Sequence, residues 1–202
     1  MSLRVGIVAL GAANRRSIEI ALTRAGARAC FVDDARTLAA CDALVLPGVA
    51  HFGYVSGELD RTGLRGALIA ATSGGVPLLA ICVGFQLLFE RSDEAPDARG
   101  LGIFAGRVRR LRTPRIPHMG WNLVEPSTSR IDAGYAYFAN SYAPDADVPD
   151  AIATSTDGND RFTCAAERDR VLGVQFHPER SGAYGARILR RFVRAATAAY
   201  VG

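Results

Sequence analysis

Lysine is absent from this chain: among its 202 residues, all 24 basic ones are arginine, and 20 acidic residues leave a formal net charge of +4. A balance this mild does not predict the dense basic surface that nucleic-acid-binding proteins present. The nearest candidate is the arginine-rich segment 107–115, which we interpret as a strand with Val108 and Leu111 buried and its arginines in solvent or at a partner surface. We therefore expect no nucleic-acid partner.

Long apolar runs, clustered cysteines and paired histidines are lacking as well. No run approaches the roughly 18 apolar residues of a membrane span, so no membrane association is expected. The apolar segment 5–13 is interpreted as a first buried strand rather than a secretion signal. The cysteines, without C-x-x-C spacing, predict neither a disulfide framework nor a zinc site and favour a reducing cytoplasm; they are Cys30, Cys41, Cys82 and Cys164. The histidines, unpaired at H-x-H or i, i+4 spacing, predict no metal site; they are His51, His118 and His177.

The composition, with 49% hydrophobic and 22% charged residues, is that of a globular protein, and we expect one domain over residues 1–202. In the first half, apolar runs alternate with segments of helical periodicity. The predicted strands are residues 4–9, 30–32, 43–46 and 76–81, and the predicted helices are residues 14–25, 35–40 and 58–72. This alternation predicts an α/β fold of three layers, in which a mostly parallel sheet is covered by helices on both faces.

The second half has a different pattern. Its apolar runs are short, rich in β-forming residues and separated by turn residues; they are residues 108–111, 135–141, 151–155, 162–167 and 171–176. Antiparallel additions to the same sheet are the simplest interpretation. A last helix is predicted from one apolar face made of Ile188, Leu189, Phe192, Val193 and Ala196.

Cys82 lies where a predicted buried strand, residues 76–81, gives way to a helix predicted from Gln86 onward. Small residues stand two positions before and after it, at Ala80 and Gly84, as a nucleophile elbow requires. The start of the following helix also favours a thiolate, the reactive form of cysteine. A buried structural cysteine is the open alternative.

A cysteine nucleophile needs a base and a group that orients the base. His177 follows an apolar run, Pro178 breaks that run, and Glu179 stands two residues after the histidine. A histidine at the end of a sheet strand with a carboxylate beside it suits a Cys–His–Glu triad. Taken singly, His177 could equally be a capping or surface histidine.

These motifs resemble the class I, triad-type glutamine amidotransferases and, within them, the glutaminase subunits of imidazole glycerol phosphate synthase. The matching segments run nearly end to end: residues 14–17, 46–53, 82–86, 116–122, 137–142 and 175–179. The cysteine elbow and the F-H-P-E segment identify the class. The P-H-M-G-W-N segment, residues 117–122, is specific to the subfamily.

The resemblance implies that Cys82 attacks the carboxamide of glutamine, that His177 relays the proton to departing ammonia, and that Glu179 orients His177. It implies an oxyanion hole made by the Val83 backbone N–H and a loop containing Gly48, Val49 and Ala50. The residues implied to hold the amino-acid end of glutamine are Gln86, Glu94, Ser141 and Tyr142. A carboxylate at Glu94 suits the α-ammonium group. No cofactor is implied, and His51 is expected to be a loop histidine without a catalytic role.

The resemblance also implies a partner, a (β/α)8-barrel cyclase that receives the ammonia and forms imidazole glycerol phosphate and an aminoimidazole carboxamide ribotide. The residues implied to dock on the cyclase are Asn14, His118, Trp121, Asn122, Tyr137 and Arg180. For the aromatic residues, burial in an ordinary core is the alternative.

Three positions depart from the pattern of this family, which usually has glycine at Ala80 and Ala50 and histidine at Asn140. Ala50 matters most, because alanine disfavours the positive φ that a peptide flip in the oxyanion loop would require. We therefore expect a low resting glutaminase rate that depends strongly on the partner. A glutaminase serving another synthase, such as a sugar-modifying one, and a weakly active paralogue that acts as a binding module remain alternatives.

Overall fold

The computed structural model describes residues 2–10, 15–113 and 115–201. The strands are β1 Arg4–Val8, β2 Arg28–Val32, β3 Ala43–Gly48, β4 Leu78–Cys82, β5 Arg91–Ser92, β6 Arg107–Arg110, β7 His118–Pro126, β8 Gly134–Asn140, β9 Tyr142–Pro144, β10 Ala151–Asp157, β11 Asp160–Arg168 and β12 Val171–Val174. The helices are α1 Arg15–Arg24, α2 Ala35–Ala39, α3 Phe52–Arg61, α4 Leu64–Ser73, α5 Val83–Gln86, the short 3₁₀ helix η1 Pro178–Arg180, and α6 Gly182–Val201.

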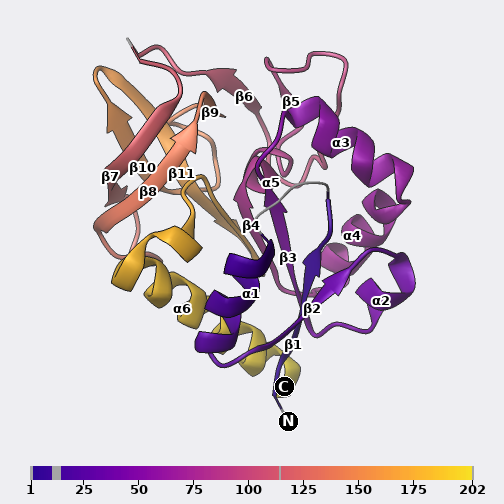
Figure 1. Cartoon of the computed structure of the whole chain (residues 1–202). Coiled ribbons are helices and arrows are strands. Elements are labelled where there is room, and N and C mark those ends of the chain that lie inside the picture. Colours follow the sequence, from indigo (N-terminus) through magenta and orange to yellow (C-terminus); the bar gives the residue numbers. More distant parts are fainter. Residues whose placement is uncertain (1, 11–14, 114, 202) are drawn as a thin grey trace.

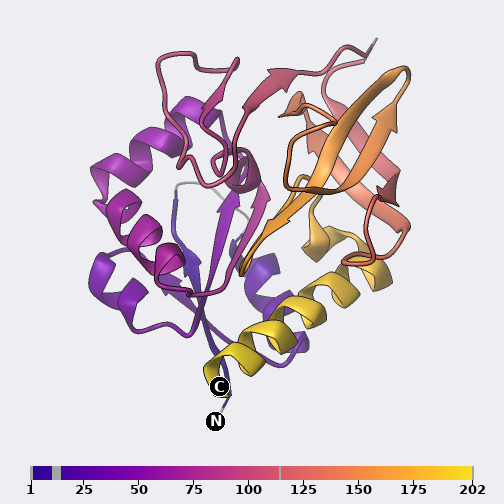
Figure 2. The ribbon, with the colours of Figure 1, turned by 180° about the vertical axis from the view of Figure 1, so that it is seen from behind.

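Within the described residues, nine strands form one sheet in the order β2-β1-β3-β4-β12-β11-β10-β7-β8 (Figure 1). The five strands from β2 to β12 are parallel to one another. Their inner members are buried on both faces, as the continuous apolar runs of the sequence predict for a parallel sheet. Helix α1 packs beside α6, while α2 and α3 pack against α4 (Figures 1 and 2). The predicted sheet between two helical layers is confirmed.

Strands β11, β10, β7 and β8 extend the sheet in antiparallel fashion, as expected for the second half. Two assignments in this half need correction. The run that begins at Val171 forms β12, which is antiparallel to β11 as expected but parallel to β4 on its other side, with Leu172 beside Leu79. Strand β6 lies outside the main sheet, in a three-stranded sheet with β5 and β9. Strand β7 was not predicted at all, because proline, glycine and polar residues obscure its alternation.

The helices also differ from the predicted ones. The single helix expected over residues 58–72 is two helices, α3 and α4, which are separated at Gly63, where φ is +69°. The helix expected from Gln86 onward in fact ends there, since α5 spans Val83–Gln86. The apolar residues that follow are buried on all sides, and such a run has no amphipathic period that separates helix from turn. The C-terminal helix is confirmed: the five residues predicted for its apolar face are all buried in α6.

Among the described helices, none has both the length and the apolar character that crossing a bilayer requires. That residues 1–202 form a single domain stays a prediction.

Candidate active site

Cys82 ends β4 and begins a sharp turn into α5. Its φ of 56° and ψ of −115° lie in a region that side-chain-bearing residues rarely adopt, so the surrounding structure must hold it there. Space at this turn is minimal: a Cβ atom added to Gly84 would lie 1.9 Å from the carbonyl oxygen of Leu46 in β3. Ala80 is fully buried between Leu46 and Gly173 of the neighbouring strands. The small residues Ala80 and Gly84, on either side of Cys82, therefore allow the strained turn to pack closely against the backbone of β3.

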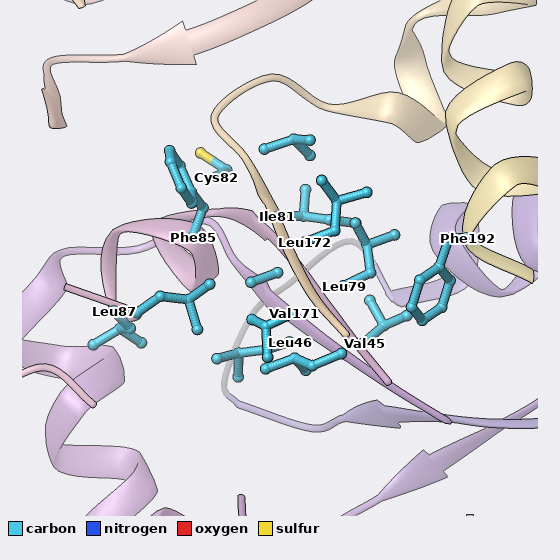
Figure 3. Close-up of a cluster of buried hydrophobic side chains, with 14 of the residues drawn as sticks. Val45, Leu46, Leu79, Ile81, Cys82, Phe85, Leu87, Val171, Leu172 and Phe192 are labelled. Carbon is cyan, nitrogen blue, oxygen red and sulfur yellow. The ribbon is translucent and has the colours of Figure 1, made fainter. Parts of the chain in front are cut away.

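The thiol of Cys82 lies at one end of the buried apolar cluster, beyond Ile81 (Figure 3). Its side chain has polar neighbours as well as apolar ones. The sulfur is 4.0 Å from the carbonyl oxygen of Ala139 and 3.8 Å from Nε2 of Gln175. The surroundings of Cys82 therefore differ from those of an ordinary core cysteine. Cys164, for comparison, lies within β11 and is completely buried.

His177 reaches Cys82 because β12 runs parallel to β4 beside it, so that both strands end at the same edge of the sheet. The backbone N–H of His177 donates to the carbonyl oxygen of Tyr137 at 2.9 Å. Its Nδ1 lies 2.9 Å from Oε1 of Glu179, and both side chains are almost completely buried. A carboxylate only accepts hydrogen bonds, so Nδ1 carries the donated proton and Nε2 is left for Cys82.

The surroundings of His177 favour its charged form. Burial on its own lowers the pKa of His177, but a hydrogen bond with the Cys82 side chain and the bond to Glu179 outweigh burial and raise that pKa to about 10. At neutral pH the ring is therefore an imidazolium. An imidazolium beside a cysteine is the arrangement that supports a thiolate nucleophile.

A pocket of about 340 Å³ opens above Cys82 and His177. This volume is in the range of small-molecule sites. Its wall is made by the loop after β3, the start of α5, Glu94 and the turn between β8 and β9; it contains Val49, Ala50, His51, Val83, Gln86, Glu94, Pro117, Ala139, Asn140, Ser141, Tyr142 and Arg180. The four residues predicted to hold the substrate are all in this wall.

Two of these residues are fixed by contacts to distant segments. Gln86 Nε2 donates to the carbonyl oxygen of Tyr142 at 2.8 Å and to Oε1 of Gln175 at 3.1 Å. Glu94 Oε2 accepts from the backbone N–H of Phe52 at 2.8 Å and so caps the start of α3. Gln175 was not among the predicted site residues. The sequence held a signal, because Gln175 stands two positions before His177 in the segment that directly follows β12.

The residues predicted for an oxyanion hole lie on both sides of the elbow. Val83 is the first residue of α5, so its N–H has no acceptor within that helix. Gly48 is buried in β3, Val49 is exposed, and Ala50 is half-buried at the pocket. Among the described residues other than glycine, only Cys82 and Asp169 have positive φ. The loop at Ala50 therefore has an unstrained backbone.

The residues predicted to dock on a partner fall into two groups. Trp121 and Tyr137 are paired across β7 and β8 with ring centroids 6.4 Å apart, and the Arg180 guanidinium lies 4.4 Å from the Tyr137 ring centroid. Met119 and Tyr135 share this face and are 64% and 62% exposed, although the sequence interpretation did not select them. We call these five residues the β7–β8 face.

His118 and Asn122 lie on the opposite side of β7 and bond within the chain. His118 Nδ1 is 3.2 Å from Asp157 Oδ2, and Asn122 Nδ2 donates to the Thr156 carbonyl oxygen at 2.9 Å. Asn14 lies outside the described residues. In the part of the chain that the structure describes, no three His, Cys, Asp or Glu side chains gather closely enough to hold a metal ion.

The sequence of this chain matches those of known proteins along nearly its whole length. The family model "Glutamine amidotransferase class-I" matches residues 14–196. The imidazole glycerol phosphate synthase subunit HisH of Deinococcus radiodurans is 42% identical over 193 residues, which cover 91% of this chain and 90% of that protein. The subunit HisH of Halobacterium salinarum is 42% identical over 93% of this chain and 91% of its own length.

A solved structure described as a glutamine amidotransferase matches with a TM-score of 0.79 over 96% of this chain and 98% of that one. Its 21% sequence identity supports a common fold alone. The family assignment rests on the sequence matches, which cover the elbow, the histidine segment and the β7–β8 face together. The chain belongs to the class I glutamine amidotransferases and, within them, to the family of imidazole glycerol phosphate synthase subunits HisH.

Proposed function

We propose that this chain hydrolyses glutamine to glutamate at Cys82 and supplies the ammonia to a cyclase in histidine biosynthesis. The observation that carries the proposal is the strained elbow at Cys82 next to the buried pair of His177 and Glu179, at the floor of an open pocket. The names of the HisH relatives, each a subunit of imidazole glycerol phosphate synthase, support the same reading. A biosynthetic enzyme of this kind works in the cytoplasm.

The first half of the reaction forms a thioester. The Cys82 sulfur attacks the side-chain carbonyl carbon of glutamine, while Nε2 of His177 holds the proton that the thiol has given up. The imidazolium then protonates the departing nitrogen, which leaves as ammonia. Glu179 keeps Nδ1 protonated throughout, so Nε2 is the atom that gains and loses the proton.

The second half consumes water. Nε2 of His177 takes a proton from the water that attacks the glutamyl thioester, and Cys82 is restored as glutamate leaves. In both halves negative charge develops on the former carbonyl oxygen. The Val83 N–H and a backbone N–H from the loop of Gly48, Val49 and Ala50 would stabilise it, a contribution of roughly 3–4 kcal/mol in other enzymes.

The wall of the pocket suits the amino-acid end of glutamine. Glu94 supplies a carboxylate for the α-ammonium group, and Gln86 presents a neighbouring amide. Ser141 and Tyr142 follow the end of β8 and line the pocket there. These groups fix the substrate so that its carboxamide meets Cys82.

The β7–β8 face supports the existence of a docking partner. Trp121 is 58% exposed in a face that also exposes Met119 and Tyr135, and aromatic residues with an arginine beside them are frequent anchors of protein interfaces. The same strand β8 continues to Ala139, whose carbonyl oxygen neighbours the Cys82 sulfur. A cyclase docked there would receive ammonia close to where it is released.

Glutamate release tests the proposal, measured for the chain alone, with a cyclase subunit of imidazole glycerol phosphate synthase, and with that cyclase and its phosphoribulosyl substrate. We expect a rate that rises with the partner and is abolished by Cys82→Ala but kept in Cys30→Ser, which removes a thiol outside the pocket. The same rate of glutamate release with and without the cyclase would contradict the cyclase assignment. Glutaminase activity in Cys82→Ala would sink the mechanism.

A second comparison tests the docking face. Trp121→Ala should weaken stimulation by the cyclase and leave the rate of the isolated chain unchanged. The matched control is Tyr54→Ala, which removes a similarly exposed aromatic ring on α3, 51% against 58% for Trp121. Equal stimulation in the two variants would contradict docking through the β7–β8 face.

A further inference from the structure

Ser181 is a buried serine, 1% exposed, that stands four residues after His177, between the short helix η1 and α6. Its hydroxyl makes two hydrogen bonds, both to backbone groups. It donates to the carbonyl oxygen of His177 at 2.6 Å and accepts from the backbone N–H of Tyr137 in β8 at 2.9 Å. One side chain therefore joins the histidine segment to a strand that lies far away in the sequence.

A helix cap is the ordinary role of a serine at this place in a chain. Ser181 directly precedes α6, and its carbonyl oxygen accepts from the backbone N–H of Gly185 at 3.0 Å, as the residue before a helix does. The hydroxyl of a capping serine accepts from a free N–H in the first turn of that helix. Within the described residues, both bonds of the Ser181 hydroxyl lead away from α6 instead. The hydroxyl thus supports the histidine segment and not the helix.

The backbone of His177 depends on such contacts for its position. Strand β12 ends at Val174, so His177 lies beyond the residues that pair with β4 and β11. Its N–H donates to the Tyr137 carbonyl oxygen at 2.9 Å. Its carbonyl oxygen accepts from the Ser181 hydroxyl and, at 3.0 Å, from the N–H of Arg180 in the same turn. Tyr137 therefore holds His177 twice, once directly and once through Ser181.

Strand β8 contacts both of the reacting side chains. Tyr137 bonds to the segment of His177, and two residues later the carbonyl oxygen of Ala139 lies 4.0 Å from the Cys82 sulfur. The bonds that attach His177 to β8 therefore also fix the position of its ring relative to Cys82. Without the Ser181 hydroxyl, the Tyr137 N–H loses its acceptor and only the direct bond between Tyr137 and His177 is left.

We propose that Ser181 is a positioning residue that holds the imidazole of His177 against the Cys82 thiol, an inference that rests on the proposed glutaminase function. An imidazolium stabilises a thiolate only while the two groups stay close, because the attraction weakens with distance. Proton transfer to the departing ammonia likewise requires hydrogen-bond reach. Ser181 is not in the wall of the pocket, so it acts on the chemical steps and not on the binding of glutamine.

The pH dependence of Cys82 alkylation by iodoacetamide tests this proposal, with the modification followed by mass spectrometry of the peptide that contains Cys82. In Ser181→Ala, alkylation at pH 7 should be about 3- to 10-fold slower than in the parent, the range that corresponds to the loss of one neutral hydrogen bond. At pH 10 an ordinary thiol is ionised without help, so the two chains should react at the same rate. A mere change in access to Cys82 would slow alkylation at both pH values.

Glutamate release by the complex with the cyclase gives a second readout. Ser181→Ala should lower kcat by a similar factor and leave KM for glutamine unchanged. Ser181→Thr, which keeps a hydroxyl, should restore both kcat and the alkylation rate at pH 7. Ser155→Ala is the matched control, because it removes a buried hydroxyl in β10 that donates to the Leu123 carbonyl oxygen at 2.8 Å, outside the pocket. It should change neither readout.

Thermal unfolding identifies a variant that does not fold. If Ser181→Ala is such a variant, Ser181→Cys takes its place, since a thiol keeps the shape of the side chain and forms only weak hydrogen bonds. Alkylation slowed equally at pH 7 and pH 10, changes as large in Ser155→Ala, or a raised KM with kcat unchanged would each overturn the proposal. If the parent complex releases no glutamate, the proposed function fails, and the alkylation comparison still decides whether Ser181 positions His177.

Discussion

Nδ1 of His177 lies 2.9 Å from Oε1 of Glu179, with only 7% and 3% of the two side chains exposed. Burial alone would lower the pKa of His177; the Cys82 side chain and Glu179 together raise it to about 10. A histidine in the unfolded chain has a pKa of about 6.5. Between these values His177 holds a proton in the folded chain that it does not hold in the unfolded chain. Protonation of His177 therefore contributes to the free energy of unfolding in full below pH 6.5, and this contribution is lost as the pH rises towards 10.

Replacing Glu179 by glutamine should change that pH dependence. Glu179→Gln removes a negative charge from Nδ1, so the pKa of His177 falls and the free energy of unfolding should decline less steeply between pH 6.5 and 8.5 than in the parent. Urea unfolding at several pH values measures both slopes, and other titrating groups, such as the buried thiols, are common to the two proteins. We also expect the glutaminase rate to fall by at least about 100-fold. If the free energy of unfolding changed with pH in the same way in both proteins, Glu179 would not be what raises the pKa of His177.

Gly84 should tolerate no side chain. Its backbone is helical, so the obstacle is space and not φ: a Cβ atom would lie 1.9 Å from the Leu46 carbonyl oxygen, a backbone atom that cannot move aside cheaply. We expect Gly84→Ala to destabilise the chain by more than about 3 kcal/mol or to displace the elbow and abolish glutaminase activity. Chemical denaturation and the rate of glutamate release measure the two effects.

Gly57 is the matched control for that substitution. It lies in α3, and a Cβ atom there would meet nothing within 4 Å. Because alanine restricts the unfolded chain more than glycine does, Gly57→Ala should stabilise the protein by about 0.5–1 kcal/mol. Similar losses of stability in both variants would show that the close approach at Gly84 is not the cause.

The parallel half of the sheet could be predicted from the sequence because its strands are short apolar runs buried on both faces. The turn at Cys82 could be placed for the same reason, since small residues at Ala80 and Gly84 flank the point where the run changes character. The direction of β12 could not. Whether a strand enters a sheet parallel or antiparallel depends on the path of the chain before it, which local patterns do not record.

The pocket was harder to predict than the elbow, because segments far apart in the sequence form its wall. Asn140 joins the pocket wall, and Gln175 contacts the Cys82 sulfur, only because β8 and β12 end beside Cys82. The same limit applies to the cysteines, whose spacing suggested no crowding: the sulfur atoms of Cys30 and Cys41 lie 3.8 Å apart, since β2 and the end of α2 meet there. Contacts of this kind depend on strand order.

Ala50 should limit the rate of the isolated chain. If a peptide flip in the oxyanion loop requires positive φ at this residue, alanine resists it by about 1–2 kcal/mol, and glycine does not. Ala50→Gly should therefore raise the resting rate of glutamate release about 5- to 30-fold. Stimulation by the cyclase should shrink in proportion, because less of the flip is left for the partner to drive.

Ala105→Gly is the control for the added backbone flexibility, because Ala105 is an exposed loop residue outside the pocket. This substitution should leave the resting rate of glutamate release unchanged. A resting rate in Ala50→Gly equal to that of the parent would show that the loop is limited by something other than φ at this position.

Arg109 in β6 ties the small sheet to the large one. Its Nη1 and Nη2 donate to the two carboxylate oxygens of Asp160 at 2.8 Å and 2.7 Å, and its Nε donates to Asp145. Arg109 and Asp160 are each 7% exposed. Burial raises the pKa of Asp160, but the bonds from Arg109 and from the Arg112 backbone N–H outweigh it and leave that pKa below its ordinary value. The pair is therefore ionised in the folded chain at neutral pH.

Arg109→Met should destabilise the chain by about 3–5 kcal/mol, because it leaves the Asp160 carboxylate buried without its partner. Urea unfolding at pH 7 measures this loss. The loss should shrink as the pH falls below 4, since a lowered pKa stabilises the fold only while Asp160 is ionised and the unfolded carboxylate becomes protonated there. Arg61→Met breaks an exposed pair with Glu58 within α3 and should change little. Equal losses of stability from the two substitutions would mean that burial does not determine how much the Arg109–Asp160 pair contributes to the free energy of unfolding.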